Sequence, residues 1–199
     1  MVIGYHIILT GYGHWLPNDP RGSLSHVIYA PEIAKLGPSH YGPKEDQPSA
    51  AEMISFQRKA ERSLHYPLLW WCPQARQELA DAIGEVVITE GLTCYACAVL
   101  ASHIHLLFRR HRMKAEAISP RLKEAGRARM RQLGFAPADH PVFSADPCHH
   151  FKSTPDQISE CVGYIADNYA KHGVEPAVAP WVTVYDGWPH GMSWQLVDV

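Results

Sequence analysis

Apolar and polar residues alternate most clearly over residues 99–110, Val-Leu-Ala-Ser-His-Ile-His-Leu-Leu-Phe-Arg-Arg. Successive side chains of a β-strand point to opposite faces, so Ile104, Leu106 and Phe108 share one face of a predicted strand. His103 and His105 lie on the other face. Two neutral imidazoles at this spacing are able to clamp one divalent metal ion. The alternative is a polar strand face that carries its histidines without binding anything.

The rest of the pattern predicts an α+β chain. Strands are expected at 5–10 and 92–101 and at a short segment beginning Pro141-Val142-Phe143; helices are expected over 50–64, from 73 to 90, over 121–133 and from 155 to 172. This order predicts a ferredoxin-like split β-α-β fold, in which a four-stranded antiparallel sheet has helices on one face. We expect one domain over 1–199, with an irregular Pro- and Gly-rich insertion at about 14–49 and a C-terminal extension at about 174–199.

The last predicted helix has clear start and stop signals. Thr154 suits the N-cap, Pro155 suits the first helical position, and Gly173 suits the end. At 100° per residue, Tyr164 and Asn168 fall together along one edge of its apolar stripe. Side chains at that edge line the crevice between helix and sheet, where a nucleophile and a metal ligand would belong.

Composition is that of a water-soluble domain, with 46% hydrophobic and 19% charged residues. No apolar run is long enough for a membrane span, and no signal-peptide pattern opens the chain. An odd number of cysteines without framework spacing favours reduced thiols and a cytoplasmic location. Cys94 and Cys97 are interpreted as core residues on opposite faces of a strand.

The net charge of −2 conceals a basic segment at 109–131, with nine Lys and Arg residues against two Glu, a local balance of +7. Such a segment is able to attract a polyanion, although a solvated helix face is the alternative. In the insertion, Trp15 and Arg21 are candidates to stack on an unpaired base and contact its phosphate, or to hold the loop on the core. Cys148-His149-His150, with Cys161 as a possible partner, is a weaker candidate for zinc.

Two of these segments resemble one known family. His103-Ile104-His105 resembles the HUH motif (His, hydrophobic, His) of the single-tyrosine transposases of bacterial insertion sequences, including the REP-associated tyrosine transposases. Tyr164-Ile165-Ala166-Asp167-Asn168 resembles the tyrosine helix of that family, although Tyr169 stands where the REP-associated group has proline. The opening strand and the segments at 12–17 and 19–22 resemble one branch of the family.

The resemblance implies a metal-dependent single-stranded DNA endonuclease and strand transferase that acts on hairpin-flanked DNA. Tyr164 would be the nucleophile and form a 5′-phosphotyrosine link. His103, His105 and Asn168 would hold Mg²⁺ or Mn²⁺, and a homodimer is favoured. The basic residues expected to contact DNA are Arg21, Arg109, Arg110, Arg112, Arg121, Lys123 and Arg127. The alternatives are a domesticated hairpin-binding protein that no longer cuts, and a zinc hydrolase that uses the histidine pair with the cluster near Cys148.

Overall fold

The computed structural model describes residues 1–23, 25–28 and 30–189. Its elements are β1 (Gly4–Thr10), β2 (Gly22–Ser23), α1 (Pro31–Ala34), β3 (Gly42–Pro43), α2 (Ala50–Glu61), α3 (Pro73–Thr89), β4 (Cys94–Val99), β5 (His103–Arg109), α4 (Ala115–Gln132), β6 (Cys148–Lys152) and α5 (Pro155–His172). Within these residues, no helix has the length and apolar character needed to cross a membrane.

Four strands form one antiparallel sheet in the order β4-β5-β1-β6. The crossovers β1-α3-β4 and β5-α4-β6 interleave, as in a ferredoxin-like split β-α-β fold, so the predicted fold class is confirmed. Pairing of β1 with β5 sets Thr10 opposite His103 and Ile8 opposite His105. Pairing of β1 with β6 sets His6 opposite His150.

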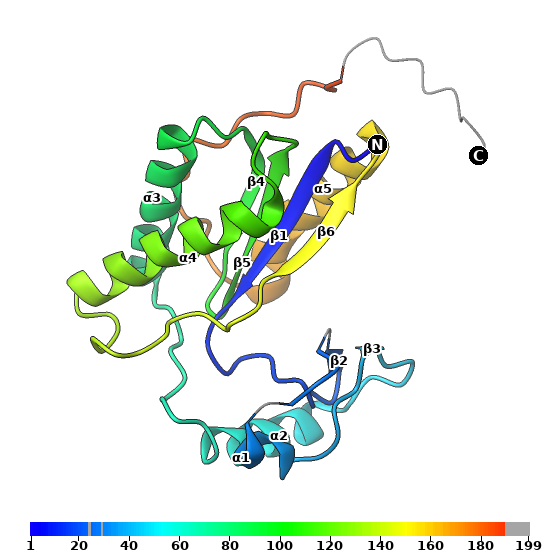
Figure 1. The fold of residues 1–199 in the computed structure, drawn as a ribbon, viewed down its shortest axis with the longest axis vertical. Helices are drawn as coiled ribbons and strands as arrows, with labels where there is room; N and C mark the ends of the chain where they lie inside the picture. Colours follow the sequence, from blue (N-terminus) through cyan, green and yellow to red (C-terminus); the bar gives the residue numbers. More distant parts are fainter. Residues whose placement is uncertain (24, 29, 190–199) are drawn as a thin grey trace.

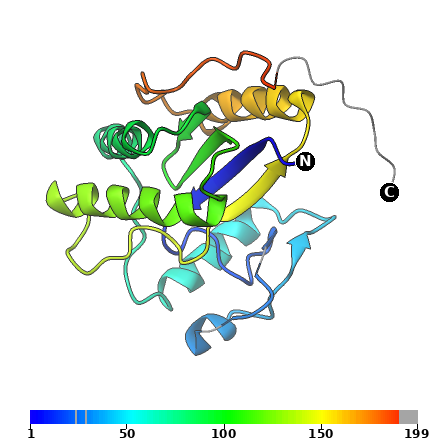
Figure 2. The ribbon, with the colours of Figure 1, turned by 45° about the horizontal axis from the view of Figure 1, so that its top comes forward.

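The two faces of the sheet are covered by different helices (Figure 2). Ile104, Leu106 and Phe108 are completely buried in the main core together with residues of α3 and α4. Leu107 belongs to a second core with Ile158, Cys161 and Ile165 of α5. His103 and His105 share the parity of Leu107, so the strand alternation predicted from the sequence places both histidines under α5.

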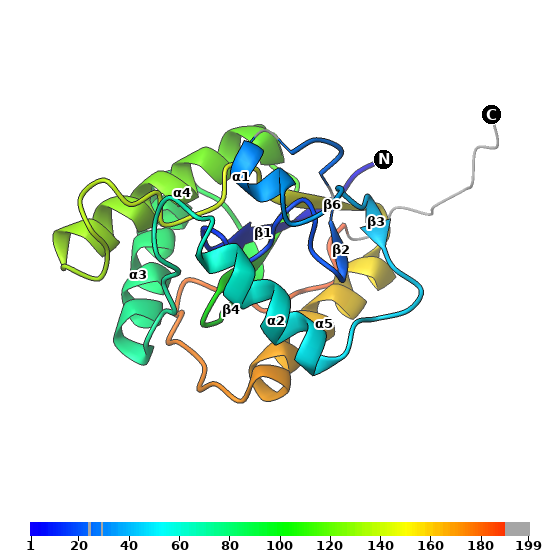
Figure 3. The same ribbon diagram turned by 90° about the horizontal axis from the view of Figure 1, so that it is seen from below.

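Residues 14–64 form a small lobe beyond the end of the sheet at which β1 ends and β5 begins (Figures 1 and 3). Its own apolar cluster is built on Leu16, Ile33 and Ala60. A capping box at Ser49 and Glu52 starts α2, as such a pair does when each side chain bonds the other residue's backbone N–H. Because β5 begins at this end of the sheet, the lobe lies next to the end of β5 that carries His103.

The described part of the C-terminal segment, residues 174–189, packs on the body. The backbone N–H of Thr183 donates to the carbonyl of Cys94 at 2.7 Å, and Arg76 donates to the carbonyl of Glu175 at 2.6 Å. The ring of Trp181 covers Gly84, where an added Cβ would lie 2.3 Å from the ring. Trp194 lies outside the described residues.

Three sequence expectations differ from the structure. The last strand is Cys148–Lys152, not a segment beginning at Pro141, because Val142 adopts φ 62° and Phe143 forms only an isolated bridge with Gly11. A bulge between Cys94 and Ala96 turns both Cys94 and Cys97 toward the main core, so their predicted opposite orientation is wrong. Helix α4 begins at Ala115, whereas the sequence predicted a start at residue 121, and it runs through Pro120.

Candidate functional site

Three histidines from two adjacent strands meet on the sheet face beneath α5. His6 Nε2 lies 3.0 Å from His105 Nδ1, and both side chains are buried. The rings of His103 and His105 are 4.9 Å apart, edge to face. Ser102 Oγ lies 3.1 Å from His103 Nδ1. The hydrogen bonds at Nδ1 of both rings leave Nε2 as the nitrogen available to a metal or substrate.

Helix α5 packs on the sheet over these rings through its apolar stripe, and a cap fixes each of its ends. Thr154 Oγ1 accepts the backbone N–H of Gln157, and Gly173 ends the helix in the left-handed conformation at φ 60°. Both caps are the ones predicted. Ile158, Cys161 and Ile165 bury the stripe against the sheet.

Tyr164 lies at the edge of the stripe, beside the histidines. Its ring centroid is 5.6 Å from that of His105 and 6.1 Å from that of His6. The side chain is 47% exposed, and Lys171 Nζ lies 5.0 Å from the ring centroid. The structure thus brings the phenol of a late helix next to an imidazole of a central strand, with one side open to solvent.

Asn168 lies one turn further along α5 and is buried. Its Nδ2 donates to the carbonyl of Tyr164 at 2.7 Å, which leaves the amide oxygen Oδ1 without a hydrogen bond among the described residues. One more turn along, the ring of His172 is 5.3 Å from that of His103. Because Tyr164 and His172 contact His105 and His103 from the same edge of the helix, Asn168 between them faces the histidine pair.

Burial keeps the central imidazoles neutral at neutral pH. Loss of water lowers the pKa of His105 to about 3, aided by the nearby His6, His172 and His150. Burial likewise lowers the pKa of His103 to about 3 and that of His6 to about 4. Neutral imidazoles carry the lone pairs that bind metal ions.

The donor atoms at this site suit a divalent cation held by few protein ligands. The available atoms are Nε2 of His103, Nε2 of His105 and Oδ1 of Asn168. In the part of the chain that the structure describes, no three His, Cys, Asp or Glu side chains are grouped to hold a metal ion. A cation bound here would therefore need oxygen ligands from water or a bound phosphate as well, as Mg²⁺ and Mn²⁺ sites often have.

The sequence also suggested a zinc site at Cys148-His149-His150. Among the described residues, no such group of metal ligands is found there. The three residues lie along β6, so adjacent side chains point to opposite faces. His149 bonds Ser119 of α4 at 2.7 Å, whereas His150 lies 3.2 Å from Cys148 Sγ on the other face. Cys161 is buried in the core under α5.

Sequence reasoning missed His6 and His172. A single polar residue within the apolar run Tyr5–Leu9 was the available signal for His6, but its partner on β5 depends on the strand register. For His172, the signal was its position two turns after Tyr164 along the same helix edge.

The basic residues predicted to contact DNA do not gather at the histidines. Helix α4 packs on the opposite face of the sheet from α5, so its cations do not lie beside the histidine pair. Several of its cations have protein partners: Arg121 pairs with Glu90 and Arg127 with Glu124. Lys123 Nζ donates to the carbonyls of Ser144 and Ala145, each at 2.6 Å.

The remaining residues predicted to contact DNA differ in their protein partners and in their exposure. Arg109, at the far end of β5 from His103, places its guanidinium 3.9 Å from the ring centroid of Trp188. Arg110 and Arg112 follow it and are exposed. Arg21 lies in the lobe near His103 and makes a bidentate pair with Asp19 at 2.8 Å.

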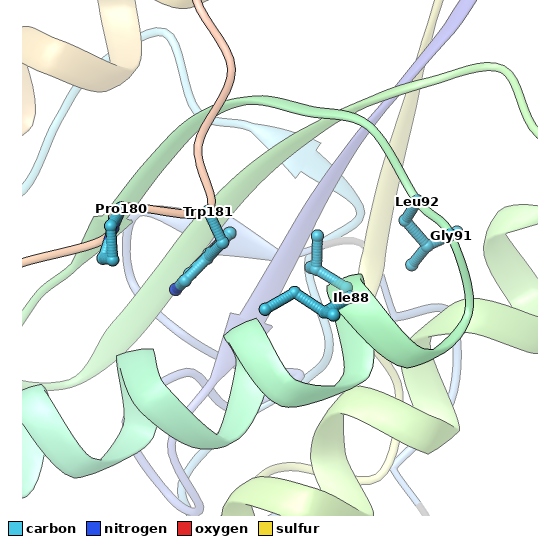
Figure 4. Close-up of a pocket in the computed structure, with 6 residues that line it drawn as sticks. Ile88, Gly91, Leu92, Pro180 and Trp181 are labelled. Carbon is cyan, nitrogen blue, oxygen red and sulfur yellow. The ribbon is translucent and has the colours of Figure 1, made fainter.

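A shallow groove of about 570 Å³ lies elsewhere, between the end of α3 and the C-terminal segment (Figure 4). Ile88, Gly91, Leu92, Pro180 and Trp181 line it together with Val87. None of these lining residues is titratable, and the groove lies on the α3 side of the sheet, away from the histidines.

No family model and no curated protein matches the sequence. Among solved structures, the chain is similar to a REP-associated tyrosine transposase bound to a REP hairpin, with a TM-score of 0.45, 12% identity, and coverage of 86% of this chain and 68% of the other. It is also similar to a Deinococcus radiodurans R1 protein provisionally assigned as a transposase, with a TM-score of 0.39, 14% identity, and coverage of 84% and 91%.

Proposed function

We propose that this protein is a metal-dependent single-stranded DNA endonuclease and strand transferase that works through Tyr164. The observation that carries the proposal is the position of the Tyr164 ring, 5.6 Å from the ring of His105. A solvent-open phenol beside neutral imidazoles and a free amide oxygen is an arrangement suited to phosphoryl transfer. The motif resemblance at residues 103–105 and 164–168 supports the same chemistry.

The proposed reaction needs no external energy source, because one phosphate ester bond forms for each one that breaks. Tyr164 Oη attacks the scissile phosphorus, an O–P bond to tyrosine forms, and the bond from phosphorus to the 3′ oxygen breaks. The phenol loses its proton and the departing 3′ oxygen gains one, which leaves a 5′-phosphotyrosine and a free 3′-OH. A 3′-OH of another strand reverses the step and joins the strands.

His103, His105 and Asn168 are the residues that would hold Mg²⁺ or Mn²⁺, which when bound supplies charge neutralisation at the phosphate. His6 holds the His105 ring in place through the bond at Nδ1. Asn168 Nδ2 donates to the backbone carbonyl of Tyr164, which fixes the orientation of the amide one turn along the helix from the proposed nucleophile.

We propose hairpin-flanked single-stranded DNA as the substrate, a homodimer as the working form and the cytoplasm as the location. An unpaired strand suits the site, because the scissile phosphate must reach side chains that lie between helix and sheet. The exposed Arg110 and Arg112 are the first candidates for contacts with the hairpin backbone.

The test is formation of a covalent adduct. The protein is incubated with Mn²⁺ and a hairpin oligonucleotide that has a 5′ single-stranded flank and a 3′ fluorescent label. The label should move with the protein on a denaturing gel, and Tyr164→Phe should abolish the band. Tyr41→Phe is the matched control, since Tyr41 is also exposed (57%) but belongs to the lobe. A wild-type protein that forms no adduct on any hairpin tested would leave the non-cleaving DNA-binding alternative.

A further inference from the structure

Trp15 is an exposed indole whose position is fixed from two sides. Its Nε1 donates to the carbonyl of Gly22 at 2.8 Å, and the guanidinium of Arg21 lies 3.9 Å from its ring centroid. Even so, the side chain stays 46% exposed, whereas Trp71, which does plug the core, is 3% exposed. A loop tryptophan that served only to pin its loop would bury more of its surface.

The guanidinium of Arg21 is likewise held in a fixed position. Its Nε and Nη2 donate to the two carboxylate oxygens of Asp19, each at 2.8 Å, and Asp19 is buried. Nη1 has no hydrogen bond among the described residues. A rigid aromatic face beside a guanidinium with a spare donor matches the two parts of a nucleotide, the base and the phosphate.

The backbone places this pair next to the histidines. Gly11 N–H donates to the carbonyl of Ser102, the residue before His103, at 2.7 Å. The ring of His14, the neighbour of Trp15, packs on Gly11, where an added Cβ would lie 2.9 Å from it and 2.9 Å from the Ser102 oxygen. Figure 1 shows the lobe beyond this end of the sheet.

We propose that Trp15 and Arg21 form a binding site for one unpaired nucleotide of the DNA strand, with the base stacked on Trp15 and a phosphate on Arg21. The site deepens the proposed function and rests on it, since it names the part of the protein that holds the strand beside the scissile phosphate. Base stacking would select unpaired DNA, because the faces of bases within a duplex are already stacked on the neighbouring base pairs.

Binding is tested in a Tyr164→Phe background, so that cleavage does not interfere. Fluorescence anisotropy measures the Kd for a hairpin with a single-stranded flank, and for a series of the same oligonucleotide with one abasic site at successive flank positions. Trp15→Ala should weaken binding by about 5- to 150-fold, the range for loss of one stacked base, and Trp15→Phe should restore most of the affinity. Phe151→Ala, which removes an aromatic ring of similar exposure (49%) on β6, should bind like the parent.

The abasic series on the parent needs no further change to the protein, so it can overturn the site even if Trp15→Ala misfolds. One abasic position should weaken binding by the parent and make it insensitive to Trp15→Ala. Equal affinity for all abasic oligonucleotides, or an equal loss on all of them after Trp15→Ala, would overturn the stacking site. A parent that binds no single-stranded DNA would overturn the function as well. Binding that depends on Trp15 without adduct formation in the wild type would keep the site and reject only the cleavage.

Discussion

His6 Nε2 and His105 Nδ1 lie 3.0 Å apart on adjacent strands, although 99 positions separate the two residues in the chain. A metal-ligating histidine needs a partner at its second nitrogen to fix its tautomer and ring orientation. In the proposed metal site, His6 would be that partner for His105. It comes from the central strand β1, which pairs with β5 on one side and β6 on the other.

We expect His6→Ala to weaken Mn²⁺ binding by about 10- to 100-fold, the usual effect of losing such a partner. Isothermal titration calorimetry in the Tyr164→Phe background measures the affinity directly, independently of cleavage. His6→Asn should recover part of it, because the amide can still bond His105. His150→Ala is the control, since the His150 ring centroid also lies near that of His6, at 5.7 Å, but its Nε2 lies 3.2 Å from Cys148 Sγ. Undiminished Mn²⁺ affinity in His6→Ala would refute this positioning role.

Stability should fall as the pH falls below about 6.5. The folded-state pKa of His103 and His105 is about 3 and that of His6 about 4, all below the ordinary value of 6.5. Between those values the unfolded chain binds more protons than the native one, so acid favours unfolding, whereas above pH 6.5 these groups contribute no pH dependence. Each buried imidazole adds up to about 1.4 kcal/mol per pH unit.

Urea denaturation at pH 7.5, 6.0 and 5.0 checks this expectation. The free energy of unfolding should drop progressively between pH 6.5 and 5.0, and His6→Gln should reduce that slope. His14, His149 and His150 also have lowered pKa values because of burial, so they act in the same direction. An unfolding free energy that stays level or rises on acidification would be inconsistent with neutral buried histidines.

Basic residues should divide into structural and DNA-binding sets. Lys123→Met leaves the carbonyls of Ser144 and Ala145 without their donor, which should cost about 2 kcal/mol of stability and leave DNA affinity unchanged. Replacing the exposed Arg110 and Arg112 together by alanine should instead weaken hairpin binding and lower the slope of log K against log salt by about 1–2. The measurements are thermal unfolding and anisotropy over a salt series, and a normal salt slope in the double variant would exclude both arginines.

Gly84→Ala should detach or strain the C-terminal segment. An added methyl would lie 2.3 Å from the Trp181 ring, and overpacking of this kind costs about 1–3 kcal/mol. Gly163→Ala is the matched control, because the added Cβ on α5 meets nothing within 4 Å and should stabilise the helix by up to about 1 kcal/mol. Urea midpoints compare the two variants; similar midpoints would show that the Trp181 contact contributes little.

Local periodicity was enough to predict much of this protein. The alternation at residues 103–108 placed both histidines on one face and Ile104, Leu106 and Phe108 on the other, because the direction of strand side chains depends only on sequence parity. Thr154, Pro155 and Gly173 marked the ends of α5 for a similar reason, since caps act on neighbouring backbone groups. The position of Tyr164 at the edge of the stripe follows from the helical repeat.

Only tertiary structure decided the rest, because those features depend on contacts between distant segments. The bond from His6 to His105 depends on strand register, and the bulge that turns Cys94 depends on its pairing with β5. Val142 adopts a left-handed conformation that a strand does not have, so the last strand lies at residues 148–152 and not at the predicted segment from Pro141. Packing on the opposite face of the sheet separated the basic helix α4 from the histidines, whereas the fold of the lobe brought Trp15 and Arg21 toward them. Such relationships depend on burial and long-range pairing, which no short window of sequence contains.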